Sequence, residues 1–476
     1  QIFGGEYSTS STAQSFYRKT QAKYRDSSAW YHIVWRHDST DGTATNRDRL
    51  YVNGVLQDWD TGLGTDLVCG QNEDSFFNYT TSPFTIGEYA STNTSSTMEF
   101  DGYMAEMNWI DGTSVAADLF GETGEYGEWK PIEYEGSYGT NGFYLPFKAD
   151  YTVEGFSTVI WKNDAPMYVG GVGFKADLVW AKSRLNAQNS AISDAITGFD
   201  RYGSTQLTNA FYSGLTSIAP TTDGFTSNTD WFSNGHSYVA WNWDMGGSNA
   251  SNTDGGITST VRANTTYGQS IVSYTGTGSA SSVGHGLDSA PDMVILKRTN
   301  AAEEWSVYHA GINPGWKVYL NGTAGEADDS NNETFGNLPS SVASTTFGVG
   351  THARANASSS TYVAYCFHDV TGYSKFSKYA GSGNSGNAVT LGFRPAFVMI
   401  KDHEHSGESW YIFDSTRNPS NPVILGVYAN ANNAEENMSG GNNRHIQFDA
   451  NGFTVLGTDS SVNASGHSYI YMAFAG

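Results

Sequence analysis

The hydrophobic residues of this chain fall in short runs that alternate with polar positions and end at Gly, Asn, Asp or Ser. Short alternating runs between turn residues are typical of β-strands, whereas a helix repeats its apolar positions every three or four residues. Residues 186–196 are the one stretch whose spacing suggests a helix. The pattern therefore predicts an all-β fold with many strands and tight turns.

The first part of the chain predicts a β-sandwich domain. Residues 29–36 form one apolar run, and residues 49–55 form a second one that contains an Asn-Gly pair. Asn-Gly favours the tight turn of a β-hairpin because both positions tolerate a positive φ. Residues 84–87 and 100–107 supply two further strands. We expect this domain to span residues 1–150.

After residue 150 the chain repeats itself with a period of roughly 110 residues. Each copy holds an apolar strand, a second strand that ends in lysine, and an aromatic strand that closes the copy. The lysine strands are 174–182, 290–297 and 395–401; the strands before them contain 159–161, 271–276 and 376–381, and the closing strands are 237–243, 361–367 and 468–474. We predict three related β-sandwich repeats over residues 151–260, 261–371 and 372–476.

The lysines that end these strands, Lys182, Lys297 and Lys401, should coincide when the repeats are superposed. Lysine is rarely fully buried. We therefore expect the three side chains to mark the point where each strand leaves the core for solvent, where each can pair with a carboxylate.

Composition limits the partners. Charged residues make up 15% of the chain, below the usual ~25%, and the formal net charge is −23. A nucleic-acid surface needs clustered Lys and Arg, so we expect no nucleic-acid binding. No apolar run approaches the ~20 residues of a membrane helix, so we expect no membrane insertion. The aromatic content of 14% is that of a folded chain.

The two cysteines, Cys69 and Cys366, lie far apart in the sequence, and we expect both to be reduced and unlinked. Cys366 lies in an apolar run, which predicts a buried thiol. Without a disulfide framework, stability has to come from the cores and from association between subunits.

The segments WYHIVW, DRLYVNGV, FTIGEY and FDGYMAEMNWIDG resemble the laminin-G-like, concanavalin-type jelly roll over roughly residues 16–120. The family has additional strands before the first of these segments. The chain begins at Gln1 with little room for them, so we expect the start of the domain to be missing.

The phrases SIVSYTGTG, VGHGLDSAPDMVILKR, YVAYCFHDVTGYSKF and GFRPAFVMIK resemble a family of marine bacteriophage virion proteins, in which tandem β domains follow a laminin-G-like domain. The resemblance implies a non-enzymatic structural protein on the particle exterior: a tail fibre or spike-like appendage that contacts host surface glycans and other virion proteins. It also implies a homo-oligomer, most simply a trimer. Capsid decoration or a fibre shaft with a purely architectural role is the first alternative.

A glycan-degrading enzyme is the second alternative, because concanavalin-type sandwiches also host glycoside hydrolases with a Glu-x-Asp-x-x-Glu strand. Glu99 and Asp101 begin this pattern, but its third position is Met104, and Glu106 falls two residues too late. The pattern therefore argues against an enzyme.

Two groups of residues could hold a metal. Asp38, Asp41 and Asp48 lie near one loop of the lectin-like domain, where oxygen ligands could bind Ca²⁺, the one cofactor that the sequence suggests. The segment Asp402-His403-Glu404-His405 holds zinc-type ligands, but it follows a lysine strand, where a turn belongs, and offers no third and fourth ligand. We therefore favour a solvated loop for this segment.

Trp305 and Trp410 occupy matching places shortly after the lysine strands of the second and third repeats. Exposed tryptophans stack on sugar rings, so both are candidates for glycan binding. The same position in two repeats also fits a structural role, in which each ring fills the same gap in a core.

Overall fold

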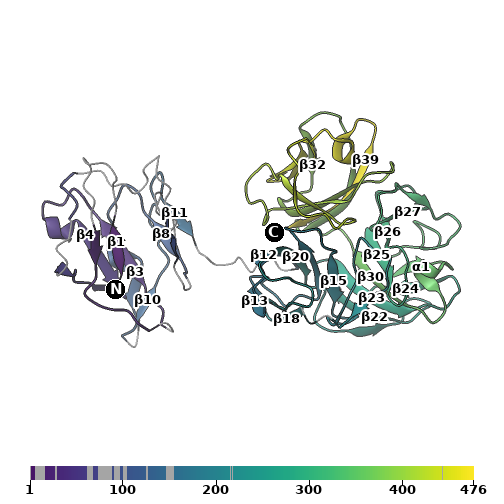
Figure 1. The fold of residues 1–476 in the computed structure, drawn as a ribbon, viewed down its shortest axis with the longest axis horizontal. Helices are drawn as coiled ribbons and strands as arrows, with labels where there is room; N and C mark the ends of the chain where they lie inside the picture. Colours follow the sequence, from purple (N-terminus) through teal and green to yellow (C-terminus); the bar gives the residue numbers. More distant parts are fainter. Residues whose placement is uncertain are drawn as a thin grey trace. The chain divides into compact units, whose positions relative to one another are not determined.

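The computed structural model describes residues 2–5, 17–26, 29–61, 68–72, 88–90, 97–99, 104–124, 127–145, 155–214, 216, 218–441 and 443–476. The chain divides into two compact units, unit 1 (residues 1–148) and unit 2 (residues 149–476) (Figure 1).

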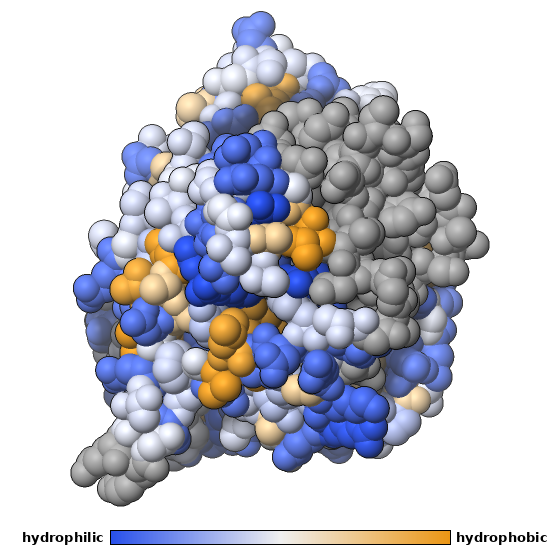
Figure 2. Space-filling view, turned by 90° about the vertical axis from the view of Figure 1, so that its left-hand side faces the viewer, coloured by the Kyte–Doolittle hydropathy of each residue, from blue (hydrophilic) through white to orange (hydrophobic). Residues whose placement is uncertain are grey.

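The predicted all-β fold is confirmed. In the described residues the α-helices are two single turns, α1 (Ala353–Asn356) and α2 (Ser460–Asn463). The helix expected over 186–196 is wrong, because this stretch contains the strand β15 (Ala191–Asp194). Among the described residues no helix is long and apolar enough to span a membrane. On the face drawn in Figure 2, hydrophobic residues form small separate groups between hydrophilic ones.

The described residues of unit 1 form short antiparallel strand pairings. β3 (Ile33–His37), β4 (Asp48–Val52) and β5 (Val55–Leu56) form a three-stranded sheet. Asn53 and Gly54, between β4 and β5, have φ angles of 48° and 75° and form the tight turn that the Asn-Gly pair predicts. The remaining pairs are β1 (Phe3–Gly5) with β2 (Tyr17–Lys19), β6 (Glu88–Ala90) with β7 (Thr97–Glu99), β8 (Met107–Trp109) with β11 (Phe143–Leu145), and β9 (Gly121–Thr123) with β10 (Trp129–Pro131). The strand expected at 84–87 lies outside the described residues, as does the first half of the strand expected at 100–107. Residues 104–106 are described and are not in a strand, and β8 begins at Met107.

Unit 2 contains three equivalent sets of strands. Repeat 1 has β12 (Phe156–Lys162), β13 (Met167–Gly170), β14 (Leu178–Ser183), β15, β16 (Arg201–Tyr202), β17 (Tyr212–Ser213), β18 (Ala219–Thr221), β19 (Gly224–Ser227) and β20 (Ser237–Trp243). Repeat 2 has β21 (Ala250–Asn252), β22 (Ser259–Asn264), β23 (Gln269–Thr275), β24 (Ser281–Gly284), β25 (Met293–Arg298), β26 (Ser306–His309), β27 (Trp316–Tyr319), β28 (Ala327–Asp328), β29 (Thr346–Val349) and β30 (Thr361–Phe367). Its sheet begins before the predicted boundary at residue 261, because β21 and β22 pair next to β23. Repeat 3 has β31 (Ser374–Ala380), β32 (Asn387–Thr390), β33 (Pro395–Asp402), β34 (Tyr411–Asp414), β35 (Leu425–Tyr428), β36 (Glu436–Asn437), β37 (Ile446–Asp449), β38 (Gly452–Val455) and β39 (Ser468–Ala475).

The main sheet has one strand order in all three repeats. It runs β12-β20-β14-β15 in repeat 1, β23-β30-β25-β26 in repeat 2 and β31-β39-β33-β34 in repeat 3, with further strands at the edges in repeats 2 and 3. A smaller sheet, β13-β19-β18, β24-β29 or β32-β38-β37, completes each repeat. Each repeat encloses its own apolar core.

The three lysines occupy one register position, as predicted. Lys182 pairs with Val239, Lys297 with Val363 and Lys401 with Ile470, which is the third residue of the closing strand in each repeat. Because successive residues of a strand point to opposite faces of a sheet, this shared register places the three lysines on the same face of their sheets.

A fourth apolar core joins the repeats. It draws buried residues from all three, and Figure 1 shows the three lobes of unit 2 around a common centre. Trp243, Phe367 and Phe474, the seventh residues of the closing strands, form a triangle there, with ring centroids 6.3, 5.9 and 6.0 Å apart. Unit 2 is therefore a ring of three related sandwiches around an aromatic hub.

Candidate functional site

The three repeats meet through one recurring backbone contact. The N–H of Phe211 donates to the carbonyl of Thr299 at 2.9 Å, Glu326 to His403 at 2.5 Å, and Glu435 to Arg184 at 3.0 Å. These bonds join repeat 1 to 2, repeat 2 to 3 and repeat 3 to 1. The contact thus closes a ring within a single chain.

The lysines of the repeats lie inside these contacts, so the expected exit to solvent is wrong. Lys182, Lys297 and Lys401 are at most 1% exposed. Lys182 donates to the carbonyl of Ala431 in repeat 3, and Lys297 to that of Thr208 in repeat 1, both at 2.7 Å. Burial lowers the pKa of each lysine from its usual 10.5 to about 8. A backbone carbonyl of a neighbouring repeat, and not solvent, therefore accepts a hydrogen bond from each of the first two ammonium groups.

The glycan-binding hypothesis for Trp305 and Trp410 is wrong, because the two side chains are 0% and 1% exposed and offer no ring face to a sugar. Each indole reaches into the preceding repeat: Trp305 donates to the carbonyl of Ser204 and Trp410 to that of Tyr319, both at 3.0 Å. The structural alternative therefore holds. Ser190 stands at the same place in repeat 1, directly before β15.

A second set of polar contacts surrounds the hub. Tyr365 of repeat 2 donates to Asp194 of repeat 1 at 3.0 Å, and Trp241 of repeat 1 donates to Asp414 of repeat 3 at 3.1 Å. The equivalent His309 of repeat 2 lies 3.1 Å from the carbonyl of Tyr471 in repeat 3. Burial lowers the pKa of His309 to about 4 and raises that of Asp194.

The three aspartates proposed for calcium serve separate partners. Asp38 accepts hydrogen bonds from Thr40, which lower the pKa of its carboxyl group, and Asp41 accepts one from the N–H of Thr43. Asp48 is buried against His37 at 2.8 Å. Among the described residues, the three carboxylates do not form a cluster in which all three could bind one metal ion. A calcium site at this loop stays a prediction.

The structure does not describe the first two carboxylates of the hydrolase pattern, Glu99 and Asp101. Asp101 lies outside the described residues, as does the side chain of Glu99 in β7. Glu106 is described and lies just before β8 with a φ of 55°. Only the sequence pattern, in which Met104 stands in place of the third carboxylate, therefore bears on hydrolase activity.

Both cysteines are thiols, as predicted. Cys366 lies at 0% exposure in the core of repeat 2, where burial raises the pKa of its thiol well above the usual value. A thiol that resists ionisation is a poor nucleophile and a poor metal ligand. Cys366 is therefore a packing residue.

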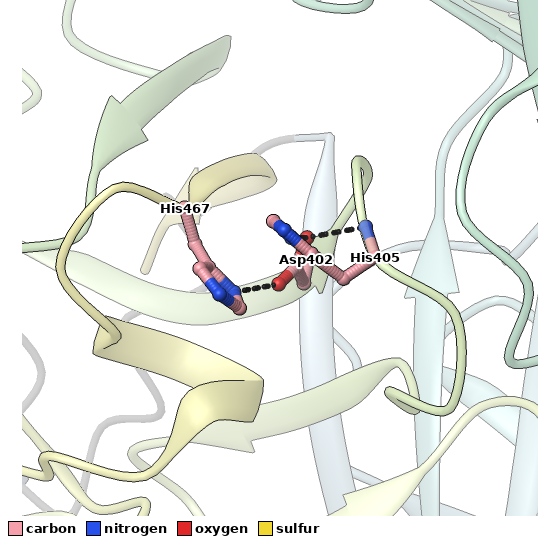
Figure 3. Close-up of side chains that lie close together, drawn as sticks. All are labelled: Asp402, His405 and His467. Carbon is pink, nitrogen blue, oxygen red and sulfur yellow. Dashed lines mark hydrogen bonds and ion pairs between the residues drawn. The ribbon is translucent and has the colours of Figure 1, made fainter.

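A different group of side chains comes together at one corner of repeat 3 (Figure 3). Asp402 ends β33, His405 lies in the turn that follows, and His467 immediately precedes β39. The Nδ1 of His405 lies 3.2 Å from one carboxylate oxygen of Asp402, and the Nδ1 of His467 lies 2.6 Å from the other. The two imidazole rings stack at 3.5 Å between centroids and 14° between planes. Their three ligand atoms lie within 4.8 Å of one another.

Solvent reaches this corner from the histidine side. The carboxylate of Asp402 is 0% exposed, whereas the side chains of His405 and His467 are 45% and 23% exposed. The backbone N–H groups of Glu404 and His405 also donate to Asp402, both at 3.0 Å, so the turn is built around its carboxylate. The solvated-loop interpretation of this segment is thus right for His405 and wrong for Asp402.

His403 does not share the site of His405, although the two are two residues apart. Its ring lies between the carboxylate of Glu326 at 3.0 Å and the hydroxyl of Ser468 at 2.9 Å. The same carboxylate–imidazole–hydroxyl arrangement occurs in serine hydrolases. In this protein it is an inter-repeat contact, because Arg184 and Glu435 form an ion pair at the equivalent place between repeats 1 and 3. The hydroxyl position also recurs, as Ser237 and Thr361, without a histidine partner in either repeat.

Sequence reasoning missed His467. A signal was present, because Gly466-His467-Ser468-Tyr469 matches the four residues 235–238 of repeat 1. Residue 467 is far from residue 402 along the chain, but the pairing of Asp402 with Tyr469 across β33 and β39 brings the two together.

The fold and its contacts define the class of protein: an all-β chain in which three related β-sandwiches close into a ring around a shared core. Residues 152–476 match the model of the family described as domain of unknown function (DUF7483), and the chain belongs to this family. The matched segment covers the three repeats together, which agrees with their common core. A search of the curated proteins finds no match to this chain.

Proposed function

We propose that this protein is a non-enzymatic structural protein on the outside of a virus particle, a tail-fibre or spike-like appendage. The observation that carries the proposal is the role of the residues at equivalent positions of the three repeats. Lys182, Lys297, the two tryptophans and the Glu326–His403 pair, which could have supplied chemistry, instead bond from one repeat to another and hold the repeats together. A ring whose distinctive side chains serve its own packing fits a rigid building block better than it fits an enzyme.

Contact with host surface glycans is the second part of this proposal. Because Trp305 and Trp410 are buried, such contact has to use aromatic side chains at the surface, of which Trp30 and Trp316 are examples at 67% and 36% exposure. Single contacts of this kind are weak, and several copies on one particle would raise the overall affinity.

Capsid decoration or a fibre shaft fits the same ring, and the position of the protein in the particle distinguishes these roles. Immunogold labelling of purified particles with antibodies against unit 2 tests both. We expect label at the tail or a spike. Label spread over the capsid would favour decoration, and label absent from purified particles would overturn the virion proposal as a whole.

Two biochemical measurements complete the test. The full chain should bind host envelope fractions without releasing reducing sugar ends; release of reducing ends would instead support the glycan-degrading alternative. Light scattering should give the mass of a homo-oligomer, with the trimer as our proposal. A monomer mass at all concentrations would remove the trimer from the proposal.

A further inference from the structure

We propose that Asp402, His405 and His467 form a binding site for one first-row transition-metal ion, typified by Zn²⁺. The ion would link the turn after β33 to the first residues of β39. This inference concerns a ligand of repeat 3 and goes beyond the proposed role in a virus particle, so that either can fail without the other.

The geometry of the cluster already brings three metal-type ligand atoms together. The Nδ1 atoms of His405 and His467 lie 3.2 and 2.6 Å from the two oxygens of one buried carboxylate, and their rings are in contact. All three ligand atoms lie within 4.8 Å of one another, so one cation could be bound by all three side chains.

The ligand types select the class of ion. Two imidazole nitrogens and one carboxylate oxygen suit Zn²⁺ and its first-row neighbours, whereas Ca²⁺ and Mg²⁺ prefer sites made wholly of oxygen. Three protein ligands leave a fourth position of a tetrahedron open. The 45% exposure of His405 allows water, or a donor from another molecule, to fill that position.

Binding requires one local movement. A metal lies in the plane of each imidazole that holds it, and rings only 14° from parallel cannot both point in plane at one ion. His405 lies in an exposed turn, so its side chain can rotate while the buried Asp402 stays in place. Asp402 thus acts as the fixed ligand and His405 as the adjustable one.

Charged groups of opposite sign lie next to this corner. The ammonium group of Lys401 is 2.5 Å from the backbone carbonyl of Asp402 and acts against a cation. Glu404 and Glu408, in the turn after β33, carry negative charge that offsets it. The formal net charge of −23 also favours the approach of cations.

The other two repeats serve as internal controls. At the places of Asp402 and His467, repeat 1 has Ser183 and His236, and repeat 2 has Arg298 and Ser360. Repeat 1 therefore retains one histidine but lacks the carboxylate, and repeat 2 carries a positive charge. The complete ligand set occurs in repeat 3, so we expect one ion for each chain and not three.

The test is calorimetric titration of the full chain with Zn²⁺, run alongside the single variants Asp402→Asn, His405→Ala, His467→Ala and His236→Ala. We expect about one equivalent of Zn²⁺ to bind the unchanged protein, with affinity reduced about tenfold or more in the first three variants and unchanged in His236→Ala. Excess Ca²⁺ should not compete. Substitution by Co²⁺ should produce the visible absorption of a low-symmetry site, and His405→Ala should abolish it.

If Asp402→Asn or His467→Ala fails to fold, His405→Ala still tests metal binding, because the side chain of His405 is half exposed. Thermal unfolding provides a second measurement: Zn²⁺ should raise the midpoint of the unchanged protein and leave that of His405→Ala where it is. Absence of Zn²⁺ binding, or binding that His405→Ala does not weaken, would overturn the proposal. Neither result would affect the immunogold test of the virion role.

Discussion

At the centre of the ring, Trp243, Phe367 and Phe474 hold one position of the closing strand in three copies, and each is aromatic and buried. At the opposite end of the same strands, the residue before the strand is His236 in repeat 1, Ser360 in repeat 2 and His467 in repeat 3. The centre is shared by all three repeats, so a change in one copy alters the packing of the others. The corner belongs to one repeat, and its residues are free to differ.

The largest effect that separates the two regions should come from Phe474→Ala. The ring of Phe474 contacts aromatic rings of all three repeats, so its removal opens a cavity in the shared core. We expect the free energy of unfolding to fall by about 3–5 kcal/mol, measured by denaturant unfolding. Leu185→Ala, at an exposed position of repeat 1, is the matched control and should change it by less than about 0.5 kcal/mol. Equal effects of the two substitutions would contradict the existence of a shared core.

Acid should weaken the centre through His309. The pKa of His309 is about 4 in the folded protein and 6.5 in the unfolded chain, because burial disfavours the charged ring. The unfolded chain therefore binds more protons between these values, and the stability from this group is complete above pH 6.5 and is lost as the pH falls toward 4. The full loss is on the order of 3 kcal/mol. Unfolding curves at pH 7 and pH 4.5 should differ less in His309→Gln than in the unchanged protein; equal pH dependence in both would show that His309 is not responsible.

Lys297→Met should have a smaller effect. It leaves the carbonyls of Thr208 and Glu303 without their ammonium donor, which should cost about 1–3 kcal/mol at pH 7. The pKa of Lys297 is about 8 in the folded protein and 10.5 when unfolded, so the unfolded chain binds more protons between these values. Stability from the lysine should therefore rise with pH over this range. The variant should lack that rise; a stability difference that does not change with pH would argue against a buried, desolvated ammonium group.

The smallest effect should come from the corner of repeat 1. His236 contacts Asn186 at the surface, so His236→Ala should change the free energy of unfolding by less than about 0.5 kcal/mol. Differential scanning calorimetry can detect a larger shift. A loss comparable to that of Lys297→Met would remove the distinction between centre and corner.

The repeats could be predicted from the sequence because their signals are local. Lysine strands and aromatic closing strands recur in order, and Lys182, Lys297 and Lys401 fall in one register. The Asn53-Gly54 turn was equally local, since both residues have the positive φ that the pair favours. The two helices were missed because a single turn is too short to show a period.

What could not be predicted depends on neighbours that the local pattern does not specify. Lys182 is buried because Ala431, a residue of another repeat, supplies its acceptor. Trp410 is buried because Tyr319 does the same. The sequence showed two members of the metal-type cluster, Asp402 and His405. The third, His467, could be recognised only from the pairing of β33 with β39.

A ring made from one chain differs genetically from a ring made from three identical subunits. In a homotrimer, every substitution appears at all three interfaces at once, so a change that suits one contact must be tolerated by the other two. Here Trp305, Trp410 and Ser190 occupy the same structural position in the three repeats, and each is encoded by its own codon. Selection can therefore act on each third of the ring independently, and a new feature can arise in one sector while the other two preserve the shape.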